Sequence, residues 1–168
     1  MSDRGSILVG LDGKAVLVKV RGRGDFSNSS SLSEFVKEMM HRGHRTFVFD
    51  LAKCDMMDST FMGTLAGIGL RLREVGQGEA VICAANARNR ELLENLGLDH
   101  VLTVLAEGAT PWVTSSESVE LEKEGSPNAE TMLEAHEALV EAQPENLAQF
   151  KDVLDYLRQD LQKPGQKP

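Results

Sequence analysis

Apolar and polar residues alternate in short blocks along the first two thirds of the chain. Residues 6–11 and 15–20 are two apolar runs separated by Asp12-Gly13, a pair typical of a two-residue hairpin turn. Residues 46–51 and 80–85 are β-rich apolar runs, which predict strands buried on both faces, and 101–105 predicts a last short strand.

Between these strands, three segments repeat their apolar residues at helical spacing. The first, 32–43, follows a polar loop at 22–31, and the third, 88–96, stops at Gly97. The strongest helix follows a polar stretch at 52–58; its single apolar stripe consists of Phe61, Leu65, Ile68, Leu72 and Val75, and Gly76-Gln77-Gly78 ends it. This order predicts an α/β fold, in which a mixed sheet opens with a hairpin, continues through right-handed βα units and is covered by helices.

Two more helical patterns, 130–142 and 145–161, follow a polar segment and flank Pro144. Each has an apolar face, and the opposite face of the second is acidic. On the apolar face of the first, His136 is expected to be half-buried. Such a helical hairpin could fold back on the sheet domain, pair with a copy of itself in a homodimer, or bind a partner. We therefore expect four parts: an α/β domain at 1–106, an acidic and polar linker at 107–128 anchored by Trp112, a helical hairpin at 129–162 and a disordered tail at 163–168.

Charge and composition narrow the range of functions. The net charge of −8 divides into −1 over residues 1–110 and −7 over 111–168, without a basic stripe, so no nucleic-acid partner is expected. No apolar run approaches the roughly 20 residues of a membrane span, and no secretory signal is evident. Cys54 and Cys83 stand apart, with no histidine at ligand spacing, which favours reduced thiols in the cytoplasm and neither a disulfide nor a metal site. Cys54 could be exposed, whereas Cys83 should be an inert strand residue.

The candidate chemistry lies where the strongest helix begins, just past the end of a central strand. In open α/β sheets this crevice collects ligands. Asp58 or Ser59 is the natural N-cap, and Ser59 presents its hydroxyl at the positive end of the helix dipole, where a phosphoryl group is tolerated. That group would add about −1.5 to −2 charges to a surface that already holds Asp25, Asp55 and Asp58, which suits a binary switch. The alternative is that the Asp-Ser-Thr triplet is only a cap, and its spacing does not decide between the two.

The wider pattern resembles the STAS family, the domain of anti-sigma factor antagonists. Three landmarks match in order: Gly22-Arg23-Gly24-Asp25, then Asp50-Leu51 through Asp58-Ser59-Thr60, then Leu92-Leu93-Glu94-Asn95-Leu96-Gly97-Leu98. The resemblance covers approximately residues 6–105. Phe61-Met62-Gly63 departs from the family's usual Gly-Leu-Gly or Gly-Met-Gly, so Phe61 could alter the fit of a kinase or act as a partner anchor.

The resemblance implies a partner switch. The unphosphorylated protein would bind an anti-sigma factor of the histidine-kinase-like ATPase class, which phosphorylates Ser59 and lets go, and a serine phosphatase would restore the hydroxyl. Asp25, Asp58, Thr60, Phe61 and Met62 would contact the partner. The chain itself would have no catalytic residues, no cofactor and no metal.

Other members of the family suggest a second function. Some STAS domains serve as structural subunits, for example beside the ATPase of a lipid transporter, or bind small ligands or nucleotides. In that case Ser59 is merely a cap and the helical tail is the docking element.

Overall fold

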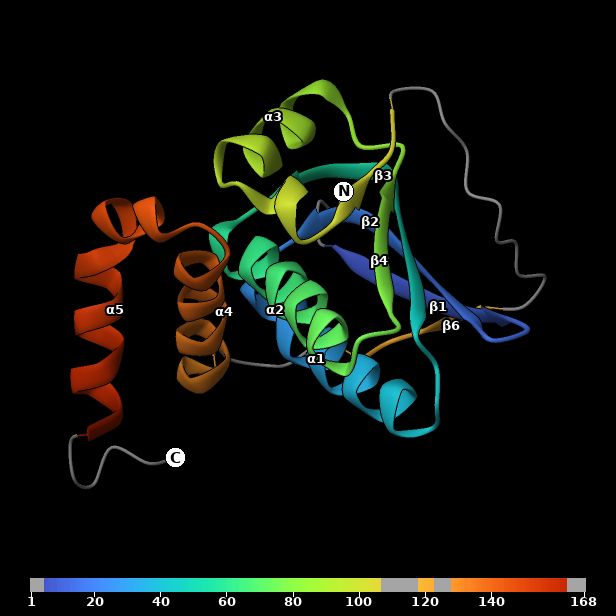
Figure 1. Ribbon diagram of the computed structural model, residues 1–168, viewed down its shortest axis with the longest axis horizontal. Helices are drawn as coiled ribbons and strands as arrows, with labels where there is room; N and C mark the ends of the chain where they lie inside the picture. The colour runs from blue at the N-terminus through green and yellow to red at the C-terminus, as the bar shows by residue number, and fades with distance from the viewer. Residues whose placement is uncertain (1–4, 107–117, 123–127, 163–168) are drawn as a thin grey trace.

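The apolar runs of the chain form one mixed sheet with the strand order β5-β4-β3-β2-β1-β6 (Figure 1). The computed structural model describes residues 5–106, 118–122 and 128–162. β2 to β5 run parallel, and β1 is antiparallel to both β2 and β6. The strands are β1 (Ser6–Asp12), β2 (Ala15–Gly24), β3 (Thr46–Met57), β4 (Glu79–Cys83), β5 (Thr103–Val104) and β6 (Val119–Glu120). The predicted α/β fold with a mixed sheet is confirmed.

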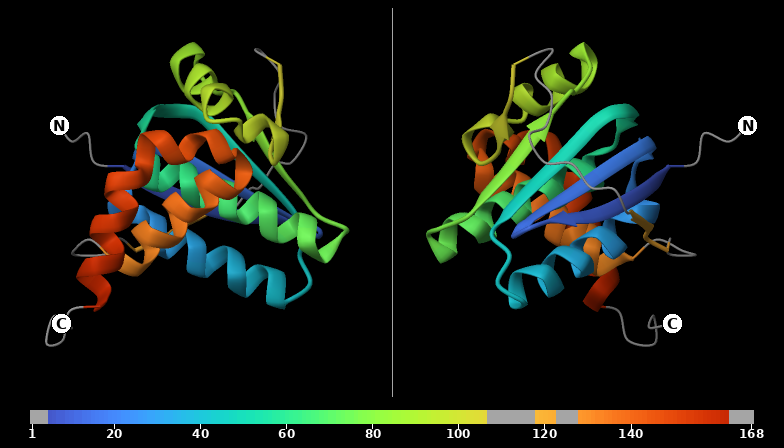
Figure 2. Two further views of the ribbon diagram at one scale, coloured as in Figure 1. Left: turned by 60° about the vertical axis from the view of Figure 1, so that its left-hand side comes forward. Right: turned by 90° about the vertical axis from the view of Figure 1, so that its right-hand side faces the viewer.

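The helices lie in successive layers on one side of this sheet (Figure 1). The helices are α1 (Phe26–His41), α2 (Ser59–Val75), α3 (Ala87–Asn95), α4 (Ala129–Ala142) and α5 (Leu147–Gln162). α1 and α2 pack on the sheet, α4 lies against α2, and α5 is outermost (Figures 1 and 2). Gly76 ends α2 in the left-handed conformation, with φ of 81°, as the glycine signal predicts.

Strand residues are buried on alternating sides of the sheet, as the continuous apolar runs predict. Phe47 and Phe49 enter the main core beneath the helices, whereas Val48 joins a smaller cluster on the opposite face, and all three are fully buried. The two C-terminal helices, α4 and α5, also contribute to the main core, through Ala138, Leu139, Phe150 and Leu154. The C-terminal helices are therefore packed into the domain rather than held away from it.

The polar segment 22–31 is not a loop. β2 continues to Gly24 and α1 begins at Phe26, so the serine-rich stretch forms the first turns of a helix. The cause is a capping box: the Asp25 side chain accepts from the backbone N–H of Ser27, and the Asn28 side chain accepts from the backbone N–H of Asp25. A complete cap offsets the low helix propensity of the serines that follow.

The strand predicted at 46–51 is longer than expected, because β3 continues through the polar stretch 52–58 as far as Met57. Its pairing with β2 persists beyond two irregularities in register, and Cys54, which pairs with Gly22 between them, is only 2% exposed. The expectation that Cys54 could be exposed is therefore wrong. β6 lies within the predicted linker and pairs with β1, and no pattern in the sequence predicts this strand. Trp112 and residues 163–168 lie outside the described residues.

The C-terminal helices fold back on their own domain, the first of the three arrangements that their sequence allowed. α4 packs along α2, and α5 packs on α4. His136 is 3% exposed, so the expectation of a half-buried side chain is wrong. Within the described parts of the chain, no helix has the length and apolar character that crossing a membrane requires.

Both cysteines are predicted to be chemically inert in the native protein. Burial raises the pKa of the Cys54 and Cys83 thiols to about 11, and only the thiolate reacts readily with electrophiles. We expect neither to be alkylated by iodoacetamide at about pH 7 until denaturant unfolds the chain. Intact mass measured over time checks this; rapid labelling of Cys54 in native buffer would contradict its burial.

Candidate functional site

The first turns of α1 and α2 meet at one rim of the sheet, and Asp58 connects them. The backbone N–H of Asp58 donates to the carbonyl of Gly24, at 2.9 Å. Its carboxylate accepts from the backbone N–H of Phe61 in α2, at 2.8 Å, and from the backbone N–H of Phe26 in α1, at 3.0 Å. One side chain therefore satisfies a free N–H group at the start of each helix.

The environment of Asp58 raises the pKa of its carboxyl group. Burial is the largest cause and the negative charge of Asp25 adds to it, against the opposing effect of the two backbone N–H bonds and of His136. Because the pKa is higher in the folded than in the unfolded chain, the contribution of this titration to stability is greatest at low pH. It is lost as the pH rises through the folded-state pKa.

Replacing Asp58 by alanine is expected to destabilise the domain. Both helix starts lose an acceptor, which corresponds to about 2 kcal/mol in the free energy of unfolding. Asp55→Ala is the matched control, because Asp55 is exposed three residues earlier, and it should change stability by less than about 0.5 kcal/mol. Urea denaturation of both variants measures the difference; equal stabilities would show that Asp58 does not hold the two helices.

Ser59 is the first residue of α2 and is half-buried at this rim. The sequence left open whether Asp58 or Ser59 caps the helix, and the structure assigns the cap to Asp58. The hydroxyl of Ser59 is thus not used within the sheet domain. Its oxygen lies instead 2.9 Å from Nε2 of His136, a residue of α4 that is 77 positions away.

The surroundings of His136 determine which ring nitrogen carries the proton when the imidazole is neutral. Nδ1 of the ring lies 2.7 Å from the carbonyl oxygen of Met132, which can only accept, so Nδ1 carries a proton. In the neutral ring Nε2 is then an acceptor, and the hydroxyl of Ser59 donates to it. Phe150 of α5 packs edge-on against the ring, with centroids 5.3 Å apart. Both hairpin helices therefore hold the imidazole over Ser59.

No pattern in the sequence indicates this contact. A histidine on the apolar side of a helix indicates burial, but it does not indicate which residue the ring meets. Asp25 and Asp58, by contrast, lie at the rim as expected, each partly exposed.

The remaining residues that we predicted as partner contacts lie beneath the rim. Thr60, Phe61 and Met62 are 3%, 0% and 5% exposed. Phe61 packs so closely on Gly24 that a Cβ added at position 24 would lie 2.6 Å from its ring. The residue that departs from the family pattern thus fills the core between two of the family landmarks.

Two large apolar side chains at the rim are exposed and were not identified from the sequence. Phe26 begins α1 with 41% of its surface exposed, and Met56 stands near the end of β3 with 37% exposed. Met56 lies two residues before Asp58 in the chain, and the backbone N–H of Phe26 donates to the Asp58 carboxylate. Among the described residues, no cluster of three potential metal ligands is found.

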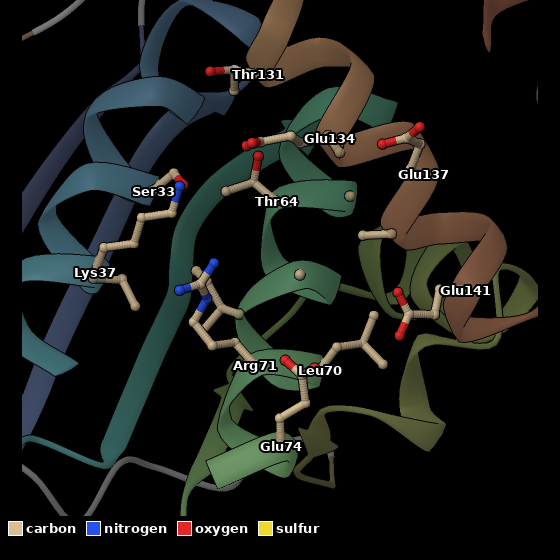
Figure 3. A pocket seen from close by; sticks show the side chains of 16 residues that line it. Ser33, Lys37, Thr64, Leu70, Arg71, Glu74, Thr131, Glu134, Glu137 and Glu141 are labelled. Carbon is tan, nitrogen blue, oxygen red and sulfur yellow. The ribbon is translucent and has the colours of Figure 1, made fainter. Parts of the chain in front are cut away.

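A cleft of about 290 Å³ separates α4 from α1 and from one side of α2 (Figure 3). Lys37 of α1 and Arg71 of α2 line one wall, and Glu134 and Glu141 of α4 line the other. In the part of the chain that the structure describes, no ion pair crosses the cleft. α4 is therefore closely packed on α2 but not sealed against α1.

Comparison with known proteins identifies a family to which most of this chain is similar. The family described as "Mlab, STAS domain" matches residues 7–106, which is more than half of the chain. No curated protein matches at a significant level.

Several solved structures share the fold at low sequence identity. The anti-sigma factor antagonist SpoIIAA in its unphosphorylated form is 15% identical, with 60% of this chain and 89% of that chain covered and a TM-score of 0.51. An anti-sigma factor antagonist from Mycobacterium paratuberculosis is 18% identical, with 65% and 90% covered and a TM-score of 0.53. Protein TM1081 from Thermotoga maritima is 15% identical, with 60% and 86% covered and a TM-score of 0.52.

Proposed function

The chain belongs to the STAS domain family, and from that premise we propose that it is a partner-switch regulator of the anti-sigma factor antagonist type. In its unmodified form it binds an anti-sigma factor of the histidine-kinase-like ATPase class. That partner transfers a phosphoryl group from ATP to Ser59 and then dissociates. A serine phosphatase removes the group, and the cycle takes place in the cytoplasm. The chain is substrate and ligand in this cycle and supplies no catalytic residue.

The observation that carries this proposal is the division of work between two neighbouring residues. Asp58 caps α2, so the hydroxyl of Ser59 can be esterified without removing a cap. A phosphate at the first residue of a helix also meets the positive end of the helix dipole, which favours anions by about 0.3–1 kcal/mol at exposed sites. The start of α2 therefore keeps its cap when Ser59 is modified, while the surface changes its charge.

The proposed binding surface is the rim around Ser59. Asp25 and Asp58 supply partly exposed polar groups, and Phe26 and Met56 supply exposed apolar area. Thr60, Phe61 and Met62 support this surface from below. A phosphate on Ser59 would stand beside the carboxylates of Asp25 and Asp58, so a partner that accommodates the unmodified rim would meet a concentrated negative charge.

The test is phosphorylation by a co-encoded kinase of this class with ATP, followed by mass spectrometry of the digested chain. Ser59 should carry the phosphate, and Ser59→Ala should abolish it. Ser27→Ala is the matched control, because Ser27 stands in the first turn of α1 at the same rim but its hydroxyl donates to Asp25. Phosphate in the Ser59→Ala variant at the wild-type level, or none on the wild-type chain with any co-encoded kinase, would overturn the proposal.

A second candidate function is favoured by one observation, the hydrogen bond between Ser59 and His136. In a structural or ligand-binding STAS subunit, for example of a lipid-transport complex, the hydroxyl would stay engaged and the domain would dock without modification. Such a protein would show no phosphate in the kinase test and would co-purify with its complex equally well as wild type and as Ser59→Ala.

A further inference from the structure

We propose that the C-terminal hairpin, α4 and α5, is an intramolecular ligand of the STAS domain that covers Ser59 and must move before a partner or kinase can reach it. The α2 surface beneath it is thus a docking surface for a helix, and α4 is its resident occupant. The covering itself stands on the contacts between α2 and α4. Only the inference that this covering controls phosphorylation of Ser59 rests on the proposed function.

The first contact closes over the hydroxyl. Nε2 of His136 lies 2.9 Å from the hydroxyl oxygen of Ser59, and the ring is buried between its own helix and Phe150 of α5. An enzyme that transfers a phosphoryl group to Ser59 must approach the oxygen that this ring now contacts. The hydrogen bond therefore excludes the reaction for as long as α4 is docked.

The second contact brings the two helices unusually close. A Cβ built on Gly63 would lie 2.2 Å from the carbonyl oxygen of Ala135, a distance at which the backbones must separate. One turn further, a Cβ on Gly67 would lie 3.7 Å from Cβ of Ala138, which is ordinary contact. The seam between α2 and α4 is thus closest within a turn of Ser59.

The far end of the hairpin is held by polar contacts to another element. The Asn146 side chain donates to the carbonyls of Leu96 and Leu139, at 2.9 and 2.8 Å, and the Gln143 side chain donates to the carbonyl of Asn95, at 3.2 Å. These bonds attach the turn between α4 and α5 to the end of α3. They involve neither Ser59 nor α2, so they can retain the turn when α4 separates from the switch.

The third side of α4 is not closed. The cleft of Figure 3 separates it from α1, and the opposed charges across the cleft are unpaired among the described residues. Separation of α4 from α2 would expose the core residues Ala138 and Leu139 and break the side-chain hydrogen bond to Ser59, without breaking an ion-pair network. This geometry suits a cover that a competing partner can displace.

The experiment introduces a chemical probe at the covered position. Ser59→Cys is made alone, with Gly63→Ala and with Gly67→Ala, and the rate of maleimide labelling is measured at about pH 9, where an accessible thiol is largely ionised. Gly63→Ala should raise the rate at least about tenfold, the ratio that corresponds to a change of about 1.4 kcal/mol in the opening equilibrium. Gly67→Ala, which makes the same helical substitution without the clash, should leave the rate unchanged.

The native cysteines distinguish local from global opening. If Cys54 and Cys83 stay unlabelled while position 59 reacts faster, α4 has moved and the domain has remained folded, as proposed. If Gly63→Ala leaves the labelling rate unchanged, or exposes all three thiols together, α4 is a fixed part of the fold and the proposal fails. These outcomes need no kinase, so they are independent of the phosphorylation test of the proposed function.

Discussion

The form phosphorylated on Ser59 is expected to bind its anti-sigma partner at least about a hundredfold more weakly than the unmodified form. A hundredfold loss corresponds to about 2.7 kcal/mol. The phosphate brings about −1.5 to −2 charges to a rim that already holds Asp25 and Asp58, and burying them in an interface adds desolvation to the repulsion. Isothermal titration calorimetry with the two purified forms measures the ratio.

Two controls separate charge from shape in this measurement. Ser59→Ala should bind at least as tightly as the unmodified protein, because it removes the hydroxyl without adding charge. The part of the loss that is due to repulsion should diminish at high salt, where the Debye length shortens to about 3 Å. Equal affinities of the phosphorylated and unmodified forms would contradict a switch at Ser59.

Phe61→Ala is expected to have the largest effect on stability. The side chain is fully buried and packs against Gly24 of β2. Truncating a core phenylalanine lowers the free energy of unfolding by about 3–5 kcal/mol. Since a domain of this size is stable by about 5–15 kcal/mol in total, much of the population would unfold on mild heating. Urea denaturation followed by circular dichroism measures the loss.

Phe26→Ala is the matched control, because Phe26 occupies the first turn of the neighbouring helix but is 41% exposed. Its removal should leave stability within about 0.5 kcal/mol and weaken partner binding. The two phenylalanines thus separate a support of the rim from a contact on it. A stable Phe61→Ala variant that loses partner binding would reverse these roles.

The fold was predictable from local signals wherever the spacing of apolar residues and the positions of turn residues indicate the same element. The hairpin turn is formed by Gly13 and Lys14, one residue later than the predicted Asp12-Gly13, because Asp12 still pairs with Ala15. Gly13 in this turn and Gly76 at the end of α2 are both in the left-handed conformation that glycine favours. The errors occur where polar residues occupy regular structure. The first turns of α1 depend on the capping box of Asp25, and the end of β3 depends on pairing with β2, which no local pattern in 52–58 indicates.

The candidate site was predictable only in part, for the same reason. Asp58 and Ser59 could be placed at the start of α2 because a cap followed by an apolar stripe is a local pattern. That Asp58 also accepts from the backbone N–H of Phe26 in α1, and that His136 contacts Ser59, are consequences of tertiary packing between segments far apart in the chain. The burial of Phe61 likewise depends on Gly24, which lies at the end of β2, far from Phe61 in the sequence.

The most direct measurement is the phosphorylation state of this position in the protein as its own cells make it. The chain is isolated with phosphatase inhibitors under conditions that activate and silence the pathway, and its peptides are examined by fragment mass spectrometry. We expect phosphate on Ser59 in a fraction of molecules that changes with the condition. An unmodified Ser59 under every condition in which the protein is active would contradict it.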